Sequence, residues 1–252
     1  MVESKSCIFV CNAEDGYLDD SFNFESSMRL IPLESQNLIL RKRLPKLQRM
    51  ALVNRLLQIY GCSKISGLKS GQLKFTRGQF GKPKLEGNGN IEFSMSNGEQ
   101  SCVMVTQQTE VGIDIASTMD CERWDEGYLH TFQDVFTDEE LAALKASSSH
   151  RDELFTLYWS MKESYTKLIG TGLNTNIKAI DIGVISTPLS EHETMTTARS
   201  INGKPVIFSS RWINNHEIVT TCTFLKSSLP VASGLYELIA VSTCDLVGYL
   251  SE

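Results

Sequence analysis

Alternating and clustered apolar residues predict several strands along the chain. Residues 73–117 contain short runs rich in Ile, Val and Phe, separated by Gly, Pro and Asn, a pattern typical of an antiparallel meander. Shorter apolar runs predict further strands at residues 6–12, 177–186, 204–213 and 217–225. The apolar end of the chain after Leu229 is expected to pack as a strand or a helix.

Three segments instead predict helices. One begins at Pro45, with Gly61 as its expected stop, and another begins at Thr137, which forms a capping box with Glu140. The longest covers about residues 152–169 and ends at Gly170 and Gly172. Its apolar side chains recur at steps of three and four and form one stripe: Leu154, Tyr158, Met161, Tyr165 and Leu168.

The tripeptide GKP occurs twice, at 81–83 and at 203–205, each time before a hairpin pattern. Coincidence explains three shared residues equally well, but the shared context favours two related α/β subdomains with a boundary near residue 110. We therefore expect an α+β fold with subdomains at 1–110 and 111–252.

Composition restricts the class of protein. The chain has 252 residues, 41% of them hydrophobic, and a formal net charge of −6, which argues against a general nucleic-acid or membrane-surface binder. Its seven scattered cysteines form no CxxC pair, and the N-terminus has no basic leader. We expect a cytosolic protein with reduced cysteines.

Asp114 lies in the middle of the apolar run VGIDIAS. Burying an unpaired carboxylate costs on the order of several kcal/mol, so Asp114 needs a partner. On the long helix, Trp159, Glu163 and Lys167 fall four apart and share one face. A solvent-exposed ion pair would explain Glu163 and Lys167, but the tryptophan indicates a covered face. Two acids and a lysine would suit Mg²⁺ and a diphosphate.

A basic cluster precedes and enters the first helix: Arg41, Lys42, Arg43, Lys46 and Arg49. Such a run is most often a solvated surface. Forked guanidinium groups also bind phosphates, so both interpretations stay open at this point.

Three motifs follow one another along the chain: FGKPKL, VGIDIAS and, about fifty residues later, LYWSMKESYTKLIGTGL. With these motifs the chain resembles the Sfp-type 4′-phosphopantetheinyl transferases. The resemblance covers about residues 41–173. The WSMKESYTK string and its distance from GID make it specific. In length and motif pattern the chain resembles the compact fungal and animal members of the family.

The resemblance implies a pseudo-twofold monomer that binds coenzyme A in a cleft between its subdomains. The implied reaction is Mg²⁺-dependent transfer of the 4′-phosphopantetheine arm to a serine of an apo carrier domain, which releases adenosine 3′,5′-bisphosphate. Asp114 and Glu163 match the Mg²⁺ ligands, Glu163 is also a candidate general base, and Lys167 matches the lysine that holds the diphosphate.

The resemblance also implies contacts with coenzyme A. Lys82 matches a phosphate-contacting position, and Ser96 matches the serine of the family's S-H segment at the coenzyme site. Arg41, Arg43 and above all Arg49 are candidates for the nucleotide phosphates. Two residues depart from the family pattern. Asn97 stands where the family usually has a histidine, and we still expect it to contact coenzyme A. Ala116 replaces a third acid found in many members. Glu99 is a guess for the missing metal ligand.

Two other functions stay open. The departures at Asn97 and Ala116 would suit a module that binds coenzyme A or carrier domains without transfer, and a Mg²⁺-dependent phosphohydrolase would also use two acids and a lysine. Resemblance to the compact members favours aminoadipate reductase as the carrier, with fatty-acid, polyketide and peptide synthase carriers as alternatives. We expect the carrier to dock near Met119–Phe136.

Overall fold

The computed structural model describes residues 6–87, 91–124, 127–185, 187, 189–225 and 236–252. Within these ranges the chain forms two compact units. The first takes its residues from Met1–Arg77, Pro83–Thr109 and Tyr236–Glu252, and the second from Gly78–Lys82 and Glu110–Leu235. Each unit combines helices with antiparallel strands, which confirms the predicted α+β class. The predicted twofold relation between the units stays a prediction.

The first unit contains a four-stranded sheet in the order β10-β1-β5-β4 and a separate β2–β3 ribbon. In the sheet only the β1–β10 pairing is parallel. The strands are β1 (Cys7–Asn12), β2 (Phe75–Arg77), β3 (Pro83–Leu85), β4 (Glu92–Asn97), β5 (Ser101–Gln107) and β10 (Glu237–Ala240). The helices are α1 (Ser21–Met28), α2 (Leu33–Leu40), α3 (Pro45–Ser66) and α8 (Thr243–Ser251).

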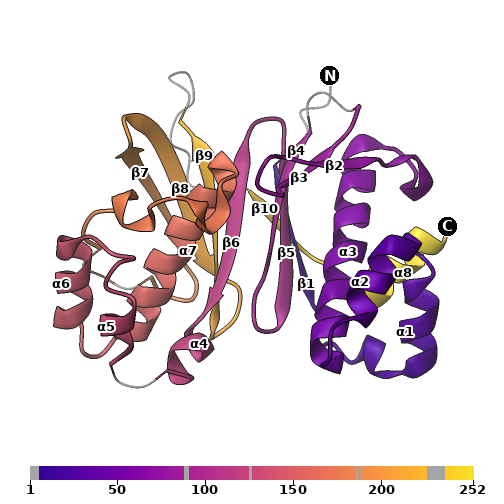
Figure 1. Cartoon of the computed structure of the whole chain (residues 1–252), viewed down its shortest axis with the longest axis horizontal. Helices are drawn as coiled ribbons and strands as arrows, with labels where there is room; N and C mark the ends of the chain where they lie inside the picture. Colours follow the sequence, from indigo (N-terminus) through magenta and orange to yellow (C-terminus); the bar gives the residue numbers. More distant parts are fainter. Residues whose placement is uncertain (1–5, 88–90, 125–126, 186, 188, 226–235) are drawn as a thin grey trace. The chain divides into compact units, whose positions relative to one another are not determined.

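Helix α3 packs on β1, β4 and β5, and α8 packs on α3 (Figure 1). The predicted stop at Gly61 is wrong, because α3 continues to Ser66 and ends at Gly67 in the left-handed conformation. Gly61 lies where the helix approaches the sheet: an added Cβ would be 2.5 Å from Met104 Sδ. Its small size serves packing rather than helix termination.

The second unit contains the antiparallel sheet β6-β9-β8-β7. Its strands are β6 (Val111–Ser117), β7 (Thr194–Ile201), β8 (Lys204–Trp212) and β9 (Glu217–Phe224). Its helices are α4 (Thr118–Glu122), α5 (Tyr128–Thr131), α6 (Asp138–Ala146) and α7 (Arg151–Ile169). Helix α7 lies against β6 and β9, as Figure 1 shows for β6.

The end of the chain differs from the predicted division. Residues 236–252 belong to the first unit rather than to a subdomain 111–252, because β10 pairs with β1 and α8 packs on α3. The expectation that the tail contains a strand or a helix is confirmed by both elements. Part of that tail, residues 230–235, lies outside the described residues.

The strand predicted over 177–186 is wrong for its described part, 177–185. A short 3-10 helix covers Ile177–Ala179, and the residues that follow it to 185 form no strand. Ile180, Ile182 and Ile185 are buried, which explains the strand-like pattern. Two of the backbone N–H groups here bond to side chains of other elements instead of a neighbouring strand.

Two further expectations concern cysteines and membranes. All seven cysteines are free, six of them buried. Among the residues that the structure describes, no helix combines the length and the apolar character that a membrane crossing requires.

Candidate active site

Strand β6 places Asp114 beneath helix α7. The key residue is Gly112, because a Cβ there would lie 1.9 Å from Ser164 O and 2.4 Å from Leu168 N of the helix backbone. Only glycine allows this close approach. Side chains alternate along a strand, so Asp114 and Ala116 lie on the same face as Gly112, toward α7.

The buried Asp114 pairs with a lysine of that helix. Its residue is 4% exposed, and its Oδ1 lies 2.7 Å from Lys167 Nζ. Its main-chain carbonyl also accepts a hydrogen bond from Ser160 Oγ at 3.3 Å. Lys167 is therefore a partner of the kind that the sequence requires for Asp114.

Glu163 lies one helical turn before Lys167 and completes the charged group. It is half-buried, and its Oε1 is inaccessible and has no hydrogen-bond partner among the described residues. Burial, and next the negative charge of Asp114, raise the pKa of Glu163 from its ordinary 4.5 to about 7, against the opposing effect of Lys167. A carboxylate with such a pKa can accept a proton near neutral pH.

Trp159 shows what covers this face of α7. The predicted face is covered by aromatic residues of the same unit, since the Trp159 ring stacks on Phe155 at 6.4 Å and meets Phe132 edge-on at 5.9 Å. The exposed Trp124 joins the same group, with its ring 4.6 Å from that of Phe132.

The donor set suits a hard cation. Mg²⁺ is commonly held by one or two carboxylates together with water and phosphate oxygens, so Asp114 and Glu163 could hold it. The inaccessible Glu163 Oε1, without a hydrogen-bond partner in the described part of the chain, fits such a role. Ala116 is buried in the core of the unit and adds no oxygen. No cluster of three or more acidic, His or Cys side chains suited to a metal occurs in the described ranges.

Lys82 lies in the same unit, close to both elements of the site. Its Nζ donates to Val111 O at 2.9 Å and to Leu168 O at 3.4 Å. It therefore joins the start of β6 to the end of α7. The dipole of α7 also favours a positive charge at this C-terminal end. Its predicted contact with a coenzyme phosphate stays a prediction.

The predicted nucleotide-binding arginines belong to the first unit. Arg41 and Arg43 are exposed at and after the end of α2. Arg49 lies on α3, and its Nε is 3.3 Å from Asp19 Oδ1. Arg41 and Arg43 are thus exposed and Arg49 is partly exposed, and their contact with nucleotide phosphates stays a prediction.

Ser96 and Asn97 end strand β4 in the first unit. Ser96 is buried, whereas Asn97 is exposed and its Oδ1 accepts a hydrogen bond from the side-chain amide of Asn54 on α3. Glu99, the guessed metal ligand, forms an ion pair of 2.5 Å with Lys46. It belongs to the first unit, whereas Asp114 and Glu163 belong to the second.

The sequence analysis did not single out two cationic residues that the structure shows to be buried or partly buried, Lys162 and Arg55. Lys162, within the WSMKES string, is fully buried and pairs with Glu140. Its position four residues after the apolar-stripe residue Tyr158 was the available signal. Arg55 on α3 lies 4.9 Å from the Phe75 ring centroid, and burial followed by the charge of Arg77 lowers its pKa. Arg55 and Arg77, whose charges influence each other, are further candidates for phosphate binding.

Comparison with known proteins finds consistent similarity. Residues 110–221 match the profile of the 4′-phosphopantetheinyl transferase superfamily, and residues 20–109 match one described as 4′-phosphopantetheinyl transferase, N-terminal. The L-aminoadipate-semialdehyde dehydrogenase-phosphopantetheinyl transferase of Saccharomyces cerevisiae is 40% identical in an alignment that covers 97% of this chain and 90% of that protein. The protein of the same name from Candida glabrata is 41% identical, covering 82% and 79%. A 4′-phosphopantetheinyl transferase of Bacillus subtilis is 25% identical, covering 52% and 56%.

Proposed function

The chain belongs to the 4′-phosphopantetheinyl transferase superfamily, and from this membership we propose that it transfers the 4′-phosphopantetheine arm of coenzyme A to an aminoadipate reductase carrier domain. The single observation that carries the proposal is the Asp114–Lys167 ion pair of 2.7 Å, with Glu163 one turn before that lysine. These residues are the acids and the lysine that the reaction uses.

The reaction is a phosphoryl transfer. The serine oxygen of the carrier forms a bond to the phosphorus that bears the pantetheine arm, and the bond from that phosphorus to the bridging diphosphate oxygen breaks. Adenosine 3′,5′-bisphosphate leaves. Glu163 is the proposed acceptor of the serine proton, and its pKa of about 7 suits this role. Lys167 supplies a positive charge for the diphosphate and for the charge that develops on the leaving oxygen.

We assign Mg²⁺ to Asp114 and Glu163, as the chemistry of the donor set supports. When bound, the cation would neutralise phosphate charge as a Lewis acid. Ala116 leaves only two protein carboxylates for it, and phosphate oxygens and water are the expected remaining ligands.

The remaining predicted contacts serve coenzyme A. Lys82, Ser96 and Asn97 are proposed to contact its phosphates, and Arg41, Arg43 and Arg49 those of the nucleotide half. Arg49 stays the first choice, because it lies on a regular helix and its ion-pair partner among the described residues, Asp19, is exposed.

The carrier is inferred from the relatives. Two relatives of about 40% identity are named for L-aminoadipate-semialdehyde dehydrogenase, so the carrier domain of that enzyme is the proposed acceptor. Docking near Met119–Phe136 is supported by the exposed Trp124 over its aromatic neighbours. Residues 125 and 126 of that stretch lie outside the described residues. A cytosolic monomer is the proposed form of the protein.

One experiment tests the transfer. The full chain is incubated with coenzyme A, MgCl₂ and the apo carrier domain, and intact-protein mass spectrometry detects one added phosphopantetheine. EDTA in place of MgCl₂, a carrier lacking the acceptor serine, and the Asp114→Ala variant should each remove the added mass. The surface variant Glu139→Gln serves as the matched control. If coenzyme A binds but no carrier gains mass, the chain is a binding module and the proposal fails.

A further inference from the structure

The lysine that precedes Glu163 pairs with an acid other than Asp114. Lys162 is 0% exposed, and its Nζ lies 2.9 Å from Oε2 of Glu140, which is also 0% exposed. Glu140 belongs to α6, whereas Asp114 belongs to β6. Helix α7 is thus held by charges at two places: Lys167 meets Asp114 of β6, and Lys162 meets α6.

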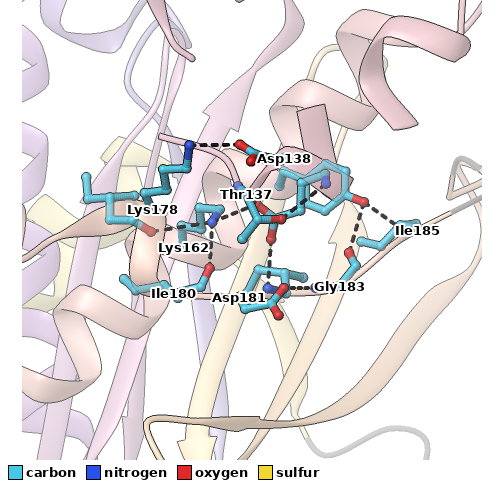
Figure 2. Close-up of polar contacts among 12 residues, drawn as sticks. Thr137, Asp138, Lys162, Lys178, Ile180, Asp181, Gly183 and Ile185 are labelled. Carbon is cyan, nitrogen blue, oxygen red and sulfur yellow. Dashed lines mark hydrogen bonds and ion pairs between the residues drawn. The ribbon is translucent and has the colours of Figure 1, made fainter. Parts of the chain in front are cut away.

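The buried pair has a complete set of hydrogen bonds. Lys162 Nζ also donates to Ile180 O at 2.5 Å and to Ile177 O at 3.4 Å. Glu140 accepts from Thr137 N at 2.8 Å in the capping box and from Ile182 N at 2.8 Å. Figure 2 shows Lys162 between the start of α6 and the irregular segment at Ile180.

A second anchor lies one turn earlier on α7. The Tyr158 hydroxyl donates to Gly183 O at 3.0 Å and accepts from Ile185 N at 2.7 Å (Figure 2). Tyr158 and Lys162 are four residues apart, so both lie on the same side of the helix. That side is fixed to the segment 177–185 over a full turn.

Stability alone gives little reason for such a pair. Removing two charges from water is costly, and replacing a buried ion pair with apolar residues of similar volume is often neutral or stabilising. Hydrogen bonds are directional, however, so a hydrogen-bonded pair restricts the relative orientation of its two elements more than an apolar contact does.

Orientation matters here because Glu163 follows Lys162 directly. Successive side chains of an α-helix point about 100° apart, so fixing Lys162 also fixes the direction of Glu163. A rotation of α7 by about 20° would move each Cα by ~0.8 Å, given the helix radius of ~2.3 Å. A misplacement of ~1 Å can cost about a hundredfold in rate.

From these contacts we infer that Lys162 and Glu140 are positioning residues, which hold α7 at the rotation that brings Glu163 and Lys167 to Asp114. The inference rests on the proposed function, because it assigns those three residues to the reaction. Neither Lys162 nor Glu140 touches the substrate, and both act through the helix.

The test separates positioning from fold stability. Lys162→Met leaves Glu140 buried without its cation, so this variant is expected to lose both stability and turnover. The double variant Lys162→Met/Glu140→Gln removes both charges, and its urea denaturation midpoint should recover most of the loss. Its kcat should stay about 10- to 100-fold below that of the wild-type chain, with KM for coenzyme A within about threefold.

Val206→Ala is the matched control, since Val206 is fully buried in the same core on β8. It should lower the denaturation midpoint and leave kcat within about twofold of wild type, measured well below the unfolding transition. A crystal structure of the double variant supplies a readout besides activity, because the 2.7 Å contact between Lys167 Nζ and Asp114 Oδ1 should be lost.

Two results would overturn the inference. One is a double variant that recovers kcat together with stability, and the other is an unchanged Asp114–Lys167 contact in its crystal structure. If Lys162→Met alone fails to fold, the double variant still decides the question. A wild-type chain that transfers nothing would instead refute the proposed function, so the two failures are distinguishable.

Discussion

Replacing Glu163 with glutamine should abolish transfer and yet stabilise the metal-free protein at high pH. The folded chain raises the pKa of Glu163 from 4.5 to about 7, chiefly through burial. The unfolded chain releases this proton near pH 4.5, so between pH 4.5 and 7 the folded state binds more protons than the unfolded state. The free energy of unfolding therefore falls as pH rises through this window, and above it the penalty is constant.

The size of the penalty follows from the pKa. At 1.36 kcal/mol per pH unit, the rise from 4.5 to about 7 corresponds to about 3 kcal/mol at most. Solvent screening of the half-buried side chain reduces it, so we expect Glu163→Gln to gain about 1–2 kcal/mol at pH 8. At pH 5 the pH is only slightly above the pKa of Glu163 in the unfolded chain. The stability gained by Glu163→Gln should therefore be below about 1 kcal/mol.

Urea denaturation in EDTA at pH 5 and pH 8 measures both values. Glu153→Gln, at a partly exposed position of the same helix, is the control and should change the unfolding free energy by less than about 0.5 kcal/mol. Adding MgCl₂ at pH 8 should stabilise the wild-type chain and leave Glu163→Gln unchanged. A variant that is less stable than wild type at pH 8, or that gains equally at both pH values, would refute the reasoning.

Three further predictions follow from particular contacts. Gly112→Ala should lower the free energy of unfolding by about 3 kcal/mol in urea denaturation, because its Cβ would meet the rigid backbone of α7; Gly61→Ala should stay within about 1 kcal/mol of wild type, because the flexible Met104 can move and alanine favours a helix. Equal costs for the two would contradict this account. Ala116→Glu should lower the Mg²⁺ concentration for half-maximal turnover by about tenfold if a coordination position is open there, and an unchanged requirement would show that the new carboxylate does not reach the cation. Asp114→Ala should reduce steady-state turnover by about a hundredfold or more, and unchanged Mg²⁺-dependent turnover would reject its assignment as a ligand.

Local chemistry was readable from the sequence. The capping box of Thr137 and Glu140 and the extent of the long helix are confirmed, because both depend on residues three or four positions apart. The shared face of Glu163 and Lys167 follows from the same spacing. The strand predicted over 177–186 failed in its described part because its pattern records burial, whereas two of its backbone N–H groups bond to Glu140 and Tyr158, which are distant in the sequence.

The sequence by itself determined which residues we propose for the chemistry: an acid within an apolar strand, and a second acid and a lysine one turn apart on a helix. Only the tertiary structure decided that Lys167 pairs with Asp114 and that Lys162 is buried against Glu140. The reason is physical. Helical spacing is a property of neighbouring residues, whereas a buried charge takes its partner from whichever element packing brings to it, and that packing depends on positions such as Gly112 where two backbones meet.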